Sequence, residues 1–281
     1  MVEFRWLYLR SVAMALVFSG LVAGLGWFGD QIDVQPGFVP VWDPEGRSFW
    51  LAGLILVALA GIFYRLLDSP PPGVEPRRAV RAEPSQSAGE LATNWVLPLL
   101  VVLSSVLVLG VYRGTTAIGA ASLISFFGLT FGPVTRQLMM FAGPDGRERA
   151  RVIFTLLVHG IAFLTLAMIY IHKVRSVFSA SAVLIVGILL LIALSEGEDG
   201  LFIRRFVYAL VGGIMLGQVT WGLNYWQATG WIGGAVLLVC FYLYGGLILT
   251  HLRRGVDARD VLEYGSVSVI AFGIIVYSLY M

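Results

Sequence analysis

An uncharged apolar run at residues 114–132, followed by Pro133, is the sequence feature that most constrains the fold. A stretch of this length matches a membrane-spanning helix, which needs about 20 residues. At about 100° per residue, its small residues fall on one side and its bulky Leu and Phe residues elsewhere. Small residues let helix backbones approach closely in lipid. We therefore expect this helix at the centre of a bundle, packed through Gly114, Ala121, Ser125, Gly128 and Gly132.

Apolar segments of similar length recur along the whole chain. Hydrophobic residues make up 58% of the sequence and charged residues only 13%, which excludes a single soluble domain. The further spans that we predict are residues 6–28, 49–67, 93–112, 152–171, 177–194, 202–222, 230–250 and 263–281. The expected fold class is all-α, a polytopic integral membrane protein with nine transmembrane helices.

A proline-rich segment interrupts the series after the second span. Residues 68–91 contain Pro70, Pro71, Pro72, Pro76 and Pro84 together with charged and small polar residues. Such a composition is typical of a semi-extended linker. We therefore predict a two-helix transmembrane unit at 1–67, a cytoplasmic linker at 68–91, and a seven-helix transmembrane bundle at 92–281. Where the first two helices dock stays open at this point.

The distribution of basic residues predicts the orientation. With a cytoplasmic N-terminus and nine spans, only Arg47, Arg113, Lys173 and Arg175 of the 19 basic residues fall outside. The other 15 lie on the cytoplasmic side, as the positive-inside rule requires. This bias predicts a cytoplasmic N-terminus and an external C-terminus. The cytoplasmic membrane of a prokaryote is the expected location.

Motifs for cofactors and metals are missing from the sequence. There is no glycine-rich phosphate loop, no His-Glu-x-x-His and no Cys-x-x-Cys. A haem would need two histidines at similar depth, but only His159 lies in mid-span, with His172 and His251 at helix ends. We expect no cofactor, no metal and no catalytic residue. The expected partners are membrane lipids and either a membrane protein or a second copy of the chain, but not nucleic acid, since no basic run occurs.

Polar and aromatic residues at the outer end of the span at 202–222 form the main candidate ligand site. Gln218, Trp221, Asn224 and Tyr225 could hold a sugar, a lipid headgroup or a small solute at the membrane mouth. The alternative interpretation is an ordinary aromatic belt with helix-end capping. His159 could meet a cavity that descends from Gln218 and Asn224, but a neutral imidazole hydrogen-bonded to a neighbouring helix is the simpler interpretation.

Two acids that follow the first span suggest an enzymatic alternative. Asp30 and Asp33 lie on the predicted outer face. This placement resembles that of the catalytic acid in multi-pass glycosyltransferases that use lipid-linked donors, which implies an activity on lipid or lipid-linked sugar. Those enzymes are usually longer and carry large extramembrane domains. Solvated loop acids are therefore the favoured interpretation.

These observations favour a non-enzymatic function. Small loops, helices with small-residue faces and the lack of catalytic motifs are typical of a small-solute or lipid transporter, or of a scaffold subunit in a membrane complex. An integral-membrane enzyme that acts on lipid or lipid-linked sugar from the outer face stays as the alternative. The sequence does not identify a substrate.

Overall fold

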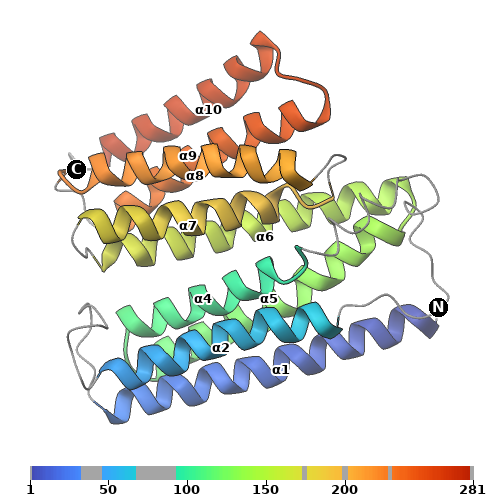
Figure 1. Ribbon diagram of the computed structural model, residues 1–281, viewed down its shortest axis with the longest axis vertical. Helices are drawn as coiled ribbons and strands as arrows, with labels where there is room; N and C mark the ends of the chain where they lie inside the picture. The colour runs from blue at the N-terminus through green and yellow to red at the C-terminus, as the bar shows by residue number, and fades with distance from the viewer. Residues whose placement is uncertain are drawn as a thin grey trace. The chain divides into compact units, whose positions relative to one another are not determined.

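The computed structural model describes residues 2–32, 46–67, 93–172, 176–197, 202–226 and 230–278. Every regular element in these ranges is an α-helix, as Figure 1 shows. Their bounds are α1 Val2–Gln31, α2 Gly46–Leu67, α4 Val96–Val111, α5 Thr115–Phe141, α6 Pro144–Ile171, α7 Ser176–Leu194, α8 Phe202–Leu223, α9 Gly230–Arg253 and α10 Ala258–Tyr277. The all-α fold class is thereby confirmed.

Eight helices in the described part of the chain are long and apolar enough to cross a membrane. The ninth, α4, is apolar but has only 16 residues, which is shorter than the predicted span at 93–112. A multi-pass membrane protein follows from these helices. The count of nine spans and the orientation of the termini stay predictions. The predicted linker at 68–91 lies outside the described residues.

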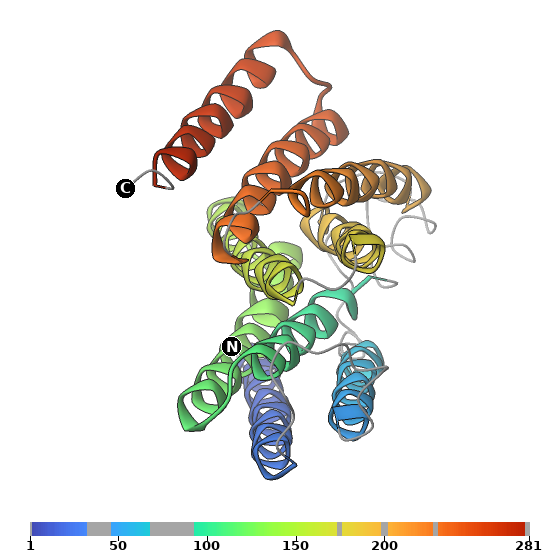
Figure 2. The ribbon, with the colours of Figure 1, turned by 90° about the vertical axis from the view of Figure 1, so that its left-hand side faces the viewer.

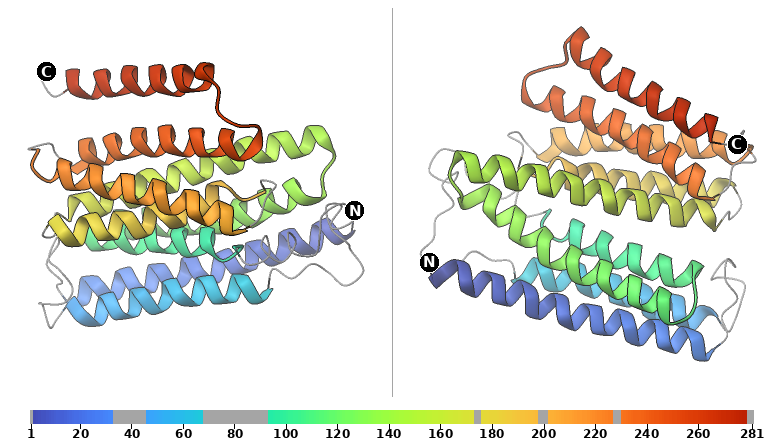
Figure 3. Two further views of the ribbon diagram at one scale, coloured as in Figure 1. Left: turned by 45° about the horizontal axis from the view of Figure 1, so that its top comes forward. Right: turned by 180° about the vertical axis from the view of Figure 1, so that it is seen from behind.

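The chain forms two compact units, residues 1–161 and residues 162–281, with the boundary inside α6. This boundary differs from the division predicted at the proline-rich segment. In the first unit α1 contacts α5, α4 and α2, and α2 contacts α4. Figure 3 shows α1 and α2 running side by side. The first two helices therefore dock on α4 and α5.

Glycines of three helices enclose α4 in the first unit. A Cβ added to Gly26 of α1 would lie 3.0 Å from the side chain of Leu109. A Cβ added to Gly53 of α2 would lie 2.7 Å from Val106, and one added to Gly128 of α5 would lie 2.6 Å from Val101. The missing side chains make room for the Val and Leu side chains of α4. As a result, 13 of the 16 residues of α4 are buried. We expected the helix after Gly114 at the bundle centre, but α4 is the more enclosed helix.

Helix α5 continues through Pro133, where the predicted span ended, and reaches Phe141. Proline has no N–H to donate to the carbonyl four residues earlier, which is that of Leu129. The hydroxyl of Tyr64 on α2 donates to the Leu129 oxygen instead, at 3.1 Å. A residue 65 positions away thus replaces the missing donor. The helix can continue because the freed carbonyl keeps a hydrogen bond in an apolar setting.

In the second unit, α7 packs extensively on α8, α8 contacts α9, and α9 contacts α10. Tyr170 of α6 joins this group because its hydroxyl donates to the carbonyl of Leu223 at 2.8 Å. Helix α10 lies beside α9, as Figure 2 shows. Only Asp260 and Ser268 of its 20 residues are buried. The tight part of this unit is therefore the α7–α8 pair.

Candidate functional site

Glycines bring the backbones of α7 and α8 close together. A Cβ added at Gly213 would lie 2.9 Å from the carbonyl oxygen of Leu184, and one at Gly217 would lie 3.2 Å from that of Ala180. The two glycines are four residues apart, so they share one face of α8. This spacing is typical of close helix crossings in membranes. The crossing holds the walls of the site at a fixed separation.

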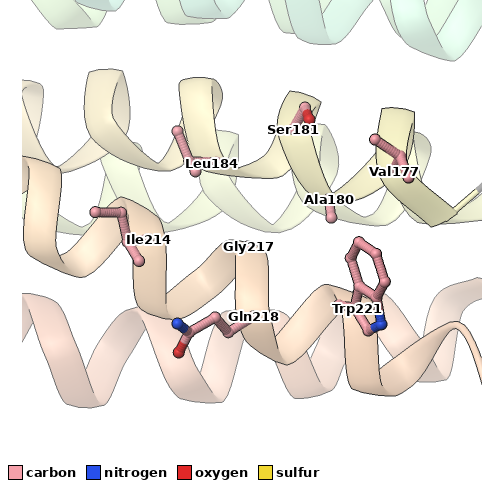
Figure 4. A pocket seen from close by; sticks show the side chains of 8 residues that line it. All are labelled: Val177, Ala180, Ser181, Leu184, Ile214, Gly217, Gln218 and Trp221. Atoms are coloured by element: carbon pink, nitrogen blue, oxygen red, sulfur yellow. The ribbon is translucent and has the colours of Figure 1, made fainter.

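A groove lies beside this crossing. We call it the α7–α8 groove, and its volume is about 410 Å³. Figure 4 shows its lining, in which the indole of Trp221 extends from α8 toward α7. The lining residues are Val177, Ala180, Ser181 and Leu184 of α7 and Ile214, Gly217, Gln218 and Trp221 of α8. The groove is open on one side, and most of its lining is apolar.

Hydrogen bonds hold the part of the groove that lies at the C-terminal end of α8. The side-chain amide of Asn224 donates to the hydroxyl of Ser179 on α7 at 2.9 Å. The buried hydroxyl of Thr220 donates to the carbonyl of Leu216 within α8 at 2.8 Å. The bond from Tyr170 to Leu223 anchors the same end to α6. These contacts join three helices around the groove and limit the movement of its walls.

Gln218 places an exposed amide at membrane depth. It lies between five and six residues from the middle of α8, which corresponds to about 8 Å along the axis. In a helix centred in the bilayer this is inside the hydrocarbon core, whose half-thickness is about 15 Å. Among the described residues, the Gln218 amide has no hydrogen-bond partner. A polar group in this environment is energetically unfavourable unless it bonds a ligand, water or another protein group.

The structure brings some of the predicted ligand residues together and leaves others apart. Gln218 and Trp221 line the groove, and Asn224 bonds across its end. Tyr225 is 74% exposed and does not line it. His159 belongs to the first unit, where its Nδ1 bonds the carbonyl of Thr155 in its own helix at 2.8 Å. A cavity shared by His159 and Gln218 stays a prediction.

Asp30, one of the two acids of the enzymatic alternative, contacts the residue that precedes α5. Its Oδ1 accepts a hydrogen bond from the backbone N–H of Gly114 at 3.3 Å. Gly114 directly precedes α5 with a φ of +88°, a conformation that favours glycine. A carboxylate at a helix N-terminus is favourable because the helix dipole is positive there. Asp30 thus has a structural role at this turn. Asp33 lies outside the described residues.

The other small residues predicted for packing lie at the interface of α5 with its neighbours. Gly128 faces Val101, and a Cβ at Gly132 would lie 3.0 Å from Leu97, both on α4. The hydroxyl of Ser125 donates to that of Ser105 on α4 at 2.9 Å. Ala121 is fully buried. This face therefore contributes to the packing of the first unit and does not line the groove.

The sequence analysis missed the glycines that build the crossing. Gly213 and Gly217 have the small-x-x-x-small spacing, but we predicted close packing for residues 114–132 and not for the span at 202–222. Ala180 and Ser181 of α7 complete the groove, but small residues of this kind occur in most spans of the chain. The spacing on α8 was therefore the one usable signal for the site.

No group of three or more His, Cys, Asp or Glu residues that could hold a metal ion occurs within the described residues. His172, just beyond the end of α6, is half-buried, and desolvation lowers the pKa of its imidazole.

A family model described as "Protein of unknown function (DUF5656)" matches residues 31–278. This range includes α2 and all later helices, and with them both walls of the groove. No curated protein and no solved structure matches the chain.

Proposed function

We propose that this chain, which belongs to the DUF5656 family of proteins of unknown function, is a non-enzymatic membrane protein that binds a membrane lipid in the α7–α8 groove. The observation that carries the proposal is an apolar groove with one exposed, unpartnered amide, Gln218, at membrane depth. Its volume of about 410 Å³ is within the range of small-molecule sites, roughly 300–1,000 Å³.

The chemistry of the lining supports an amphipathic ligand. Val177, Leu184 and Ile214 offer apolar contacts to a hydrocarbon chain. The amide of Gln218 and the hydroxyl of Ser181 can bond an ester or hydroxyl group. The indole of Trp221 combines an apolar ring with an N–H donor, as side chains at the membrane interface often do. A lipid fits this combination better than a small polar solute would.

The lining also supports binding in preference to catalysis. It contains no Asp, Glu, His, Cys or Lys. A serine such as Ser181 becomes a nucleophile only with an adjacent base, and none lines the groove. Transport of the bound lipid is the wider role that we propose, because the open side of the groove allows a ligand to enter from the bilayer.

The test measures how much lipid the purified protein retains. Ser181→Phe fills the groove, and Gln218→Leu removes its amide. The matched control is Ile185→Phe, since Ile185 is exposed on α7 but does not line the groove. After purification in a mild detergent, lipid bound per protein is measured by native mass spectrometry. We expect retention by the wild type and the control. Gln218→Leu should lose about tenfold, as when one or two polar contacts are removed, and Ser181→Phe should lose at least as much because its ring occupies the groove.

Equal retention by the wild type, both groove variants and the control would contradict the proposal. A loss in the control as large as in the Ser181→Phe variant would also contradict it, because lipid would then bind to the helix surface without using the groove. Unfolding temperatures of all four proteins show whether a loss of lipid arises from misfolding.

A further inference from the structure

Tyr208 of α8 links its helix to α9 at the end of the bundle opposite the groove. Its hydroxyl oxygen lies 2.7 Å from Nε2 of His251, in the last turn of α9. The two rings meet edge to face, with their centroids 5.0 Å apart. When the tyrosine hydroxyl donates to Nε2, the neutral imidazole carries its proton on Nδ1. The Nδ1–H of His251 is then the one donor that the ring offers to a further group.

Arg204 contacts the ring of the same tyrosine. Its guanidinium carbon is 5.9 Å from the centroid of the Tyr208 ring, within reach of a cation–π interaction. Arg204 is exposed and forms no ion pair with a carboxylate of the described residues. Two neighbouring arginines differ from it. Arg254 is paired with Asp257 and Asp260, and Arg205 is buried with a donor bond to Ser195.

Exposed apolar side chains lie close to Arg204 in the sequence of α8. Ile203 is 62% exposed, and Phe206 and Val207 are exposed as well. In a membrane helix such residues contact lipid, so the guanidinium lies at the edge where lipid headgroups meet the helix. The distribution of basic residues predicts that this end is cytoplasmic. Anionic lipids are enriched in that leaflet.

We propose that Arg204, Tyr208 and His251 form a binding site for the phosphate group of an anionic membrane lipid. The planar guanidinium can bond two phosphate oxygens at once. The Tyr208 ring positions the guanidinium and, through its hydroxyl, fixes the tautomer in which Nδ1 of His251 can donate. The lipid chains then lie along the exposed apolar surface of α8. This site does not depend on the α7–α8 groove.

The experiment measures binding of defined ligands to the purified full-length protein in detergent. Short-chain phosphatidylglycerol is the probe, and diacylglycerol of the same chain length, which lacks the phosphate, is compared with it. Inorganic phosphate tests the other source of the same chemistry. We expect phosphatidylglycerol to bind more tightly than either compound by about tenfold, the effect of one hydrogen bond to a charged group.

Three variants locate the site. Arg204→Gln should weaken phosphatidylglycerol binding about tenfold and leave diacylglycerol binding unchanged. His251→Phe keeps an aromatic ring but removes the donor, so it should weaken binding less. The matched control is Arg259→Gln, since Arg259 is also exposed and its substitution removes the same charge. Binding of phosphatidylglycerol to this control should change less than twofold, because salt screens the attraction between the lipid and a remote charge.

The proposal is overturned if Arg204→Gln and Arg259→Gln weaken binding equally, because general charge attraction would then explain the result. It is also overturned if inorganic phosphate binds as tightly as phosphatidylglycerol, since the ligand would then be a free phosphate. Arg204→Lys provides a second measurement if the glutamine variant fails to fold. Lysine keeps the charge but loses the bidentate geometry, and a severalfold weakening is expected.

Discussion

Helices α4 and α10 are both apolar, but their surroundings differ greatly. Of the 16 residues of α4, 13 are buried, and α1, α2 and α5 all contact it. Of the 20 residues of α10, two are buried, and among the described helices it packs extensively only on α9. Hydrophobicity does not distinguish the two environments, because lipid is as apolar as the interior of the protein.

The residues that face each helix account for the difference. Five glycines on α1, α2 and α5 lie against α4: Gly26, Gly53, Gly61, Gly128 and Gly132. On α9, Gly246 receives the ring of Tyr264 from α10. The glycines of α10 itself, Gly265 and Gly273, have no atom within 4 Å of an added Cβ. In a membrane protein, small residues on the neighbouring helices thus decide which apolar helix is enclosed.

The largest expected effect is the loss of a side chain from α4. Leu100 is fully buried, so Leu100→Ala should leave a cavity and lower the free energy of unfolding by about 2–5 kcal/mol. Ile270 of α10 is 63% exposed, and Ile270→Ala should change it by less than about 0.5 kcal/mol. Denaturant unfolding in one detergent measures both. Equal losses would show that α10 is as closely packed as α4.

A smaller effect is expected at the proline of α5. Tyr64→Phe removes the donor to the carbonyl of Leu129 and should lower the free energy of unfolding by about 1–3 kcal/mol. The control on α10 is Tyr277→Phe, at an exposed position, where no loss is expected. Pro133→Ala restores the backbone donor. In that background Tyr64→Phe should cost less, and a cost that stays the same would refute our account of Pro133.

The same proline shows which parts of the fold could be predicted from the sequence. Apolar length gave the positions of the helices, because each span meets a fixed bilayer thickness. The sequence predicts a span that ends before Pro133, because proline usually stops a helix. The donor that lets α5 continue comes from Tyr64, which is distant in sequence. No local pattern contains that information.

The candidate site was predictable in part for a related reason. Gln218 and Trp221 could be predicted because an amide and an indole close together at a span end can hold a ligand. The α7 wall of the groove was not recognised, since Ala180 and Ser181 are ordinary residues in a span. Their role arises only because Gly213 and Gly217 bring α8 against them. Helix pairing decides which small residues line a site, and the sequence alone does not show that pairing.

The smallest expected effect contrasts two buried serines. Ser125 donates to Ser105 across the α4–α5 interface, and hydrogen bonds between membrane helices contribute about 0.6 kcal/mol on average. Ser125→Ala should therefore lower the free energy of unfolding by about that amount. Ser105 keeps its bond to the carbonyl of Val101, so no partner is left stranded.

Substitution of Ser268 on α10 should change the free energy of unfolding in the opposite direction. Its hydroxyl is buried but has no hydrogen-bond partner among the described residues. Burial of an unpaired hydroxyl costs about 1 kcal/mol or more, so Ser268→Ala should leave stability unchanged or raise it by up to about 1 kcal/mol. The two alanine variants are compared by their unfolding midpoints in the same detergent. If Ser268→Ala destabilises as much as Ser125→Ala, the Ser268 hydroxyl has a partner, and α10 is held more specifically than its exposed surface indicates.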